Sequence, residues 1–194
     1  NGDFSCLSIY LSKLDAEIWN EFFNNWDILP FESEKLLADF EERTIEQLND
    51  FPDLEFQKEG MTKEQLVKVR VNQSFFRSSI FASYNNTCCI TGIQQPEFLI
   101  AGHIKPWSVD EKNRLNPQNG IAINALHDKA FETGLMTITT DYKIKISPTL
   151  FKHQKSKSFE DYFLKLDNQD IILPSRFLPD IEFLKYHNDV RFKH

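Results

Sequence analysis

The sequence has few cysteines and no long apolar segment. Three cysteines among 194 residues cannot all pair, and the adjacent Cys88 and Cys89 are poorly placed to bond one another, so a disulfide framework is not expected. No run approaches the roughly 18 apolar residues of a membrane span, and the first residues lack the basic and apolar regions of a secretory signal. We therefore expect a cytoplasmic protein with reduced thiols and no membrane partner.

The charge is unevenly distributed along the chain. A formal net charge of −7, taken alone, argues against a nucleic-acid-binding protein, because phosphate neutralisation supplies most of the non-specific affinity for DNA. However, residues 1–60 hold 15 acidic and 4 basic side chains, whereas residues 61–194 hold 14 acidic and 18 basic ones. The acidic charge belongs to the N-terminal third, and this asymmetry is itself a hint of nucleic-acid binding.

The change in charge coincides with a predicted domain boundary near residue 60. DAEIWNEFFNNW and SEKLLADFEERTIEQL have apolar residues at helical spacing, and FPDLEFQKEG has the composition of a linker. We predict an acidic helical N-terminal region, residues 1–60, and a second domain, residues 61–194. The N-terminal helices are candidates for homodimerisation or for contact with a partner.

The second domain is predicted to begin with a helix and a hairpin. VNQSFFRSSIFASY has the periodicity of an amphipathic helix that ends at Asn85 and Asn86. CCITG and FLIAGHI are short apolar runs that suggest the two strands of a hairpin, with His103 at the end of the second strand. A long loop is expected over residues 105–118.

Three further elements are predicted after this loop. NALHDKAFETG suits a short helix that Asn124 caps and Gly134 ends. LMTITTDYKIKIS alternates around a turn at Thr140 and Asp141 and predicts another hairpin. LPDIEFLKYHNDV predicts a C-terminal helix that begins at Pro179.

Three polar residues stand between the apolar runs of residues 101–134. His103, Asn119 and His127 are separated by 16 and 8 residues, which is long enough to put each side chain on a different structural element. An imidazole with a pKa of about 6.5 can accept a proton from water while remaining largely unprotonated at neutral pH. The order suggests a nuclease site in which a metal and a general base face each other.

These motifs resemble those of the HNH endonucleases at AGHI, NPQNG and LHDKAFETG. The sequence is most similar to bacterial HNH proteins described as restriction endonucleases, in which segments like VKVRVNQSFFR, CCITG, HIKPW and FLPDIEFLKYH follow in the same order; the resemblance covers residues 67–187. It implies an α+β fold: a ββα-metal nuclease core with an α-helical N-terminal extension, an additional hairpin and a C-terminal helix. It also implies a divalent cation and hydrolysis of DNA phosphodiesters in restriction or phage defence.

The resemblance also suggests a role for each residue of the site. His103 is expected to be the general base, and His127 the best metal ligand. Asn119 is expected either to bind the ion through its carbonyl oxygen or to hold the loop so that His103 keeps its orientation, and we favour the second role. The sequence departs from the commonest HNH pattern at Gly102, where many relatives place a ligating Asp or His. With so few protein ligands the shell would be rich in oxygen, which favours Mg²⁺ or Mn²⁺ over Zn²⁺.

Other titratable residues are given simpler interpretations. Asp128 and Glu132 lie on the same predicted helix as His127 and are candidates for extra metal ligands, although we favour a position for both on the exposed side of the helix or in local capping. His153, His187 and His194 lie in basic or terminal stretches and are expected to be solvated.

Several basic side chains are candidates for contact with a phosphate backbone. They are Arg77, Lys105, Lys129, Lys143 and Lys145. Each of them alone is more simply a solvated surface charge. The sparse metal ligands also leave an alternative open, an HNH-like module that binds nucleic acid without cutting it.

Overall fold

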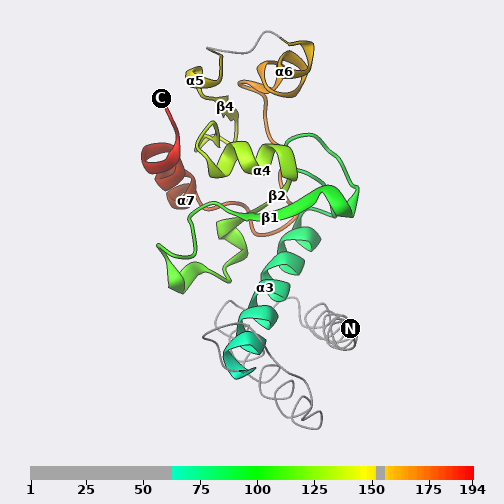
Figure 1. The fold of residues 1–194 in the computed structure, drawn as a ribbon, viewed down its shortest axis with the longest axis vertical. Helices are drawn as coiled ribbons and strands as arrows, with labels where there is room; N and C mark the ends of the chain where they lie inside the picture. The colour runs from blue at the N-terminus through cyan, green and yellow to red at the C-terminus, as the bar shows by residue number, and fades with distance from the viewer. Residues whose placement is uncertain (1–62, 152–155) are drawn as a thin grey trace. The chain divides into compact units, whose positions relative to one another are not determined.

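The computed structural model describes residues 63–151 and 156–194. The helices predicted for residues 1–60 therefore lie outside the described residues, and the boundary near residue 60 stays a prediction. The chain divides into two compact units between Ser78 and Ser79, inside the long helix α3 (Lys63–Ser83) (Figure 1). The second unit, Ser79–His194, holds every strand that the structure describes and the residues of the predicted site.

Helix α3 ends where the sequence predicts. Asn85 and Asn86 both have a φ of 52°, and asparagine is among the few residues that adopt this left-handed conformation at low cost. The backbone N–H of Asn86 then donates to the carbonyl of Phe81 at 2.7 Å, which closes the end of the helix.

The segment CCITG forms a tight turn and not the strand predicted from its sequence. The N–H of Gly92 donates to the carbonyl of Cys88 at 3.0 Å, and Gly92 has a φ of +73°, a conformation that glycine adopts without penalty. The chain therefore reverses before it can extend. Cys88 and Cys89 are both fully buried free thiols, as expected of reduced cysteines that pack like small apolar residues.

The partner of the strand that carries His103 comes from later in the sequence. Strand β1 (Leu99–His103) pairs antiparallel with β2 (Gly120–Asn124), so that Leu99 lies opposite Asn124 and His103 lies opposite Gly120. The loop between the strands contains two short 3₁₀ turns, η2 (Glu111–Asn113) and η3 (Pro117–Asn119). The prediction of a hairpin that ends at His103 is therefore wrong in its partner but correct in placing His103 at the end of a strand.

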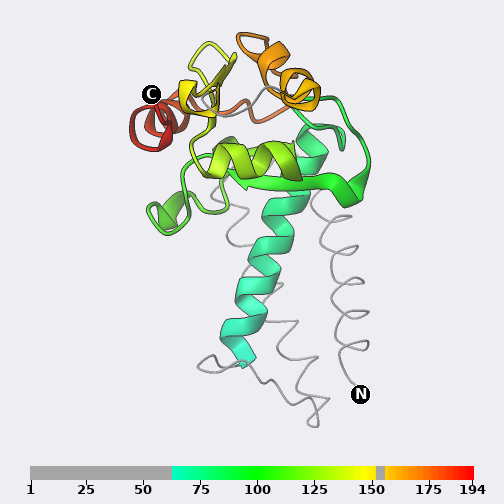
Figure 2. The ribbon, with the colours of Figure 1, turned by 45° about the horizontal axis from the view of Figure 1, so that its top comes forward.

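Helix α4 (Ala125–Glu132) follows β2 directly and has the predicted caps. The side-chain oxygen of Asn124 accepts a hydrogen bond from the N–H of His127 at 3.1 Å. At the other end Gly134 has a φ of +73°, and a Cβ there would lie 1.9 Å from the carbonyl oxygen of Arg191, so no other residue fits. The helix packs on the β1–β2 pair, as two views of the ribbon show (Figure 1, Figure 2).

The second predicted hairpin is confirmed. Strand β3 (Met136–Ile138) pairs antiparallel with β4 (Ile144–Ile146). Along β4, Ile144 and Ile146 are buried while Lys145 is exposed, the alternation expected of a strand with one solvent face. The helices α5 (Pro148–Phe151) and α6 (Lys157–Tyr162) and the 3₁₀ turn η4 (Leu164–Leu166) follow.

The C-terminal helix is also confirmed, and it brings a correction. Helix α7 (Ile181–Tyr186) is capped by Asp180 and continues into a π-helical turn, η5 (His187–Arg191). His187, expected to be solvated, is 2% exposed. Its Nδ1 lies 2.8 Å from the hydroxyl of Thr137, and its ring stacks on that of Phe131 with centroids 3.7 Å apart. The turn that carries His187 places its ring on the inner face of the helix. Its position near the end of the sequence does not predict this burial.

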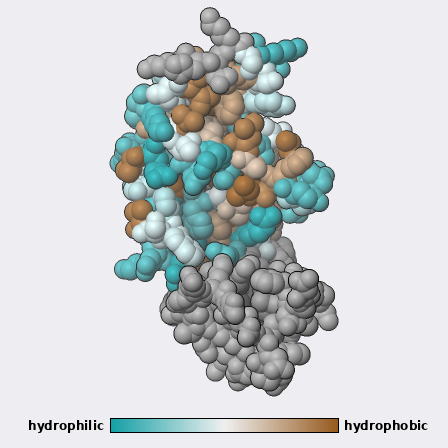
Figure 3. All heavy atoms as spheres, viewed as in Figure 1, coloured by the Kyte–Doolittle hydropathy of each residue, from teal (hydrophilic) through white to brown (hydrophobic). Residues whose placement is uncertain are grey.

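The described fold is α+β, as predicted. Its core is built from apolar side chains of the four strands and the helices that cover them, with Ile121, Ile123, Met136 and Ile138 fully buried. On the face shown in Figure 3, hydrophilic side chains alternate with apolar ones. Among the described residues, no helix is long and apolar enough to cross a membrane.

Candidate active site

His103 lies at the last position of β1, where the strand gives way to the loop. Its Nε2 is 2.8 Å from the carbonyl oxygen of Arg114 in that loop. Because a carbonyl can only accept, Nε2 carries the proton, and the lone pair of the neutral ring is then on Nδ1. Burial lowers the pKa of His103 more than this hydrogen bond raises it, so the ring is neutral at neutral pH. A neutral imidazole is suited to accept a proton from water.

Asn119 joins the two ends of the loop that begins after His103. Its side chain is fully buried. The oxygen Oδ1 accepts from the N–H of Lys105 at 2.8 Å, and the amide Nδ2 donates to the carbonyl of Lys105 at 3.0 Å and to that of Asn113 at 3.2 Å. The backbone carbonyl of Asn119 also accepts from Ile104 at 2.9 Å. These bonds fit the orienting role, since Oδ1 is already used by the loop.

The middle of the loop is tied by a second set of polar contacts. Lys105 Nζ lies 2.9 Å from a carboxylate oxygen of Asp110, and the side-chain amide of Asn113 donates to both oxygens of that carboxylate at 3.1 and 3.0 Å. Hydrogen bonds from Lys105 and Asn113 lower the pKa of Asp110. These contacts hold the part of the loop that precedes Arg114, whose carbonyl orients His103.

His127 is buried in α4 and both of its ring nitrogens have partners. Nε2 lies 2.8 Å from the carbonyl oxygen of Tyr162, the last residue of α6, and must donate to it. Nδ1 therefore accepts, and the amide of Asn124 lies 2.8 Å from it. Burial lowers the pKa of His127 more than the bond to Tyr162 raises it. His127 is therefore hydrogen-bonded to Asn124 and Tyr162. His103 and Asn119, in contrast, are both hydrogen-bonded to residues of the loop between β1 and β2.

A carboxylate that the sequence analysis set aside lies against β1. A Cβ on Gly102 would be only 2.9 Å from Oδ1 of Asp128, so the Asp128 side chain occupies the space beside the residue that precedes His103. Burial, and then the charge of Glu132, raise the pKa of Asp128. Glu132 itself is exposed, as expected, and pairs with Lys129 at 2.8 Å. The glycine before His103 was the sequence signal for this approach, because only there does the strand lack a side chain.

The basic candidates are spread over several elements. Three lysines are already paired with acids: Lys105 with Asp110, Lys129 with Glu132, and Lys143 with Asp170. Lys145 lies 5.6 Å from the centroid of the Phe192 ring.

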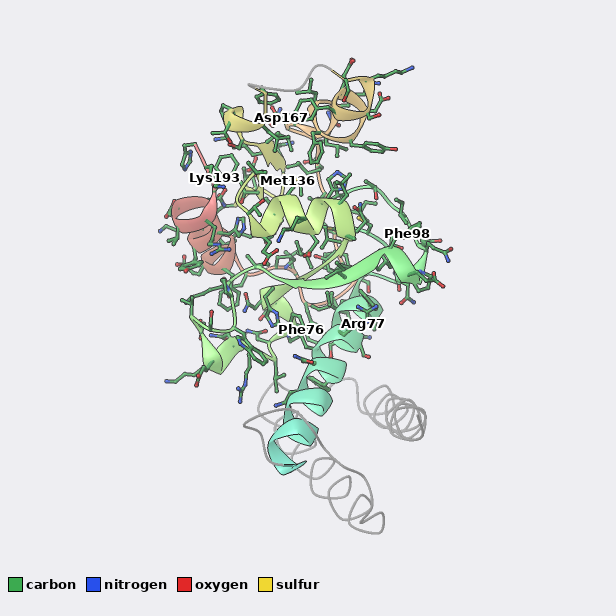
Figure 4. The ribbon with its side chains drawn as sticks, viewed as in Figure 1. Phe76, Arg77, Phe98, Met136, Asp167 and Lys193 are labelled. Carbon is green, nitrogen blue, oxygen red and sulfur yellow. The ribbon has the colours of Figure 1, made fainter. Side chains whose placement is uncertain are left out.

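Arg77 is the remaining basic candidate. It is exposed on α3 and belongs to the first compact unit (Figure 4). In the second unit, Lys143 and Lys145 occupy alternate positions at β4, and therefore extend from the same side of the strand.

A cation at the candidate site would need ligands from water or substrate in addition to those of the protein. In the described part of the chain, no three side chains of His, Cys, Asp or Glu gather into a ready-made metal site. Water and substrate oxygens would complete the shell of any bound divalent ion.

The comparisons with known proteins concern the sequence of this region. No curated protein matches the chain. Residues 88–139 match the family model described as HNH endonuclease, and they include β1, the loop, β2, α4 and β3. HNH nucleases act on nucleic acid and generally use a divalent metal ion. The segment that carries the candidate site is therefore similar to HNH endonucleases.

Proposed function

We propose that the domain formed by residues 61–194 is a metal-dependent endonuclease that hydrolyses phosphodiester bonds of DNA. In this proposal β1, β2 and α4 are the ββα-metal core. The observation that carries it is the placement of His103 at the end of β1, where its Nε2 donates to the carbonyl of Arg114 at 2.8 Å. A ring fixed in this way, with a lowered pKa, is prepared to act as a base.

The chemistry follows from this arrangement. Nδ1 of His103 takes a proton from water as the water oxygen attacks phosphorus, and the bond from phosphorus to a sugar oxygen breaks. Asn119 keeps the loop closed, so that the carbonyl of Arg114 holds the ring during this step. When bound, a divalent cation stabilises the charge on the phosphate and on the departing oxygen.

The sequence assigns the cation to His127 and Asn119, and that assignment remains a proposal. His127 would have to give up the hydrogen bond to Tyr162 or the one from Asn124 to serve as a ligand. Asn119 Oδ1 already accepts from Lys105 and would offer a cation its second lone pair. An oxygen-rich shell favours Mg²⁺ or Mn²⁺. The carboxylate of Asp128 beside Gly102 fits such a hard cation.

The substrate is proposed to be DNA held by the basic candidates. Lys143 and Lys145 extend from one side of β4. Lys105 lies in the loop after β1, and Lys129 lies on α4. The ion pairs of Lys105, Lys129 and Lys143 would exchange an acidic partner for a phosphate. Restriction or phage defence in the cytoplasm is the proposed setting, with the N-terminal region contacting a second copy or a partner.

A substrate and metal screen tests the proposal. The full chain is incubated with plasmid, single-stranded DNA and RNA in the presence of Mg²⁺, Mn²⁺ or Zn²⁺, with His103→Ala as the control. We expect nicked or linear plasmid with Mg²⁺ or Mn²⁺, and none with the variant or with a chelator. Full activity of His103→Ala would contradict the assignment of the base.

The alternative function is a module that binds nucleic acid without cutting it. It is favoured by one observation, the absence of a three-residue metal cluster in the part of the chain that the structure describes. Calorimetric titration with Mn²⁺ separates the two. If no ion binds even with DNA present, while DNA itself still binds, the module is supported.

A further inference from the structure

Gly102 and Asp128 meet at the start of the loop that holds His103. The Asp128 Oδ1 is 2.9 Å from the point where a Cβ on Gly102 would stand, and the methyl Cγ2 of Ile123 is 3.5 Å from the same point. Any side chain at residue 102 would therefore collide with the carboxylate before it met another atom. A glycine at this position allows a carboxylate from α4 to reach the strand.

Within residues 63–151 and 156–194, the Asp128 carboxylate has no hydrogen-bond or ion-pair partner, although its residue is half-buried. Its charged neighbours are Glu132, which repels it, and Lys129, whose ammonium lies 2.8 Å from Glu132. A partly desolvated carboxylate without a partner is unfavourable unless a cation or a donor completes it.

We propose that Asp128 is the carboxylate ligand of the divalent cation, and that it takes the place which a side chain at residue 102 would otherwise fill. The inference rests on the proposed endonuclease function and names a ligand for the same site. The carboxylate lies beside Gly102, the residue preceding His103, near the end of β1. Mg²⁺ and Mn²⁺ are bound by one or two protein carboxylates, with water and phosphate supplying the other oxygens.

The neighbouring side chains are less suited to this position. Glu132 is exposed and engaged with Lys129. His127 is 1% exposed and uses both ring nitrogens inside the protein. With Asp128 as the ligand, His127 keeps its bonds and fixes the helix from which the carboxylate extends.

Binding of Mn²⁺ tests the inference without relying on catalysis. The titration uses the full chain carrying His103→Ala, so that a short DNA duplex stays uncut, and calorimetry measures the dissociation constant for Mn²⁺. Adding Asp128→Asn should weaken Mn²⁺ binding at least 10-fold. The matched control, Glu132→Gln on the same helix, should change it by less than about 2-fold, because Glu132 faces solvent and Lys129.

A second variant, in which the carboxylate is moved from residue 128 to residue 102, distinguishes loss of the metal ligand from misfolding. Asp128→Ala removes the oxygen that a Cβ on Gly102 would meet, and the other contacts of that Cβ, 3.5 and 3.8 Å, are ordinary. Gly102→Asp in the Asp128→Ala background should therefore return Mn²⁺ affinity to within several-fold of the reference. Thermal unfolding of each variant accompanies the titrations.

The outcomes separate this inference from the proposed function. Equal Mn²⁺ affinity with and without Asp128→Asn, or no binding by the reference protein, overturns the inference. If wild-type protein and Asp128→Asn cleave plasmid equally, the endonuclease stands and the ligand assignment falls. If Asp128→Asn loses Mn²⁺ but wild type cleaves nothing, the cation site stands and the endonuclease falls.

Discussion

His103, at the end of β1, and His127, in the first turn of α4, form the same kind of hydrogen bond but differ in their surroundings. His103 and His127 each lie 2.8 Å from a backbone carbonyl through Nε2, and burial lowers the pKa of both. His103 is only half-buried at the edge of a loop, whereas His127 is 1% exposed and accepts from Asn124 through Nδ1. The comparison teaches that a hydrogen bond to a carbonyl and a lowered pKa do not identify a base; access to solvent and substrate decides between the two.

The largest expected effect is on the cleavage rate of His103→Ala. Loss of a positioned base should lower the single-turnover rate constant about 100- to 10,000-fold. The melting temperature should move little, because the ring is half-exposed. In wild type, the rate should rise with pH through a value below 6.5 and level off near neutral pH, because the pKa of His103 is lowered. If the substitution leaves the cleavage rate unchanged, His103 is not the general base and does not differ from His127 in this respect.

In contrast to His103→Ala, His127→Ala should mainly lower the stability of the protein. The change leaves a cavity and takes partners from the Tyr162 carbonyl and the Asn124 amide, which together should cost about 4 kcal/mol of the free energy of unfolding. Denaturant titration measures this cost. His194→Ala, at an exposed position, is the matched control and should leave stability unchanged. A His127→Ala protein that is fully stable but unable to bind Mn²⁺ would instead favour His127 as a metal ligand.

A third histidine extends the comparison to pH. Burial lowers the pKa of His187 to about 4 from 6.5, so the unfolded chain takes up its proton first as the pH falls. The stability contributed by the neutral ring is complete above pH 6.5 and is lost between pH 6.5 and 4, by about 3 kcal/mol. Unfolding curves across this range should show the loss, and His187→Gln should reduce its slope. An identical slope in the variant would show that other groups are responsible.

The smallest predicted effect measures what the side-chain amide of Asn124 adds to its cap. Asn124→Ala removes the cap of α4 and the amide that reaches His127 Nδ1, Thr91 Oγ1 and Cys88 Sγ, and should cost about 2 kcal/mol. Ser156→Ala removes only a cap, that of α6, and should cost about 1 kcal/mol. Denaturant midpoints of the two variants give the difference. Equal losses would mean that the amide contacts of Asn124 add nothing to the cap.

Much of the local structure could be predicted from the sequence. Asn85 and Asn86 ended α3 as expected, Asn124 and Gly134 bounded α4, and the hairpin of β3 and β4 turned where its alternation broke. These features depend on residues close together in the chain, where backbone preference and capping dominate.

Features that depend on distant segments were harder to predict. CCITG looks like a strand, yet a glycine turn reverses it, and β1 pairs with residues 120–124 across a long loop. His187 is near the end of the sequence, yet Thr137 and Phe131 surround it. Neither the pairing nor the burial follows from local composition, because both are set by which apolar surfaces meet.

The sequence by itself determined the order of His103, Asn119 and His127, the caps that place them, and the missing side chain at Gly102. Only the tertiary structure decided what each residue touches: the loop closed by Asn119, the carbonyls that take the protons of the two histidines, and the approach of Asp128 to the strand. The physical reason is that capping and turns act over a few residues, whereas hydrogen bonds of side chains and the space beside a glycine depend on segments brought together by burial of the core.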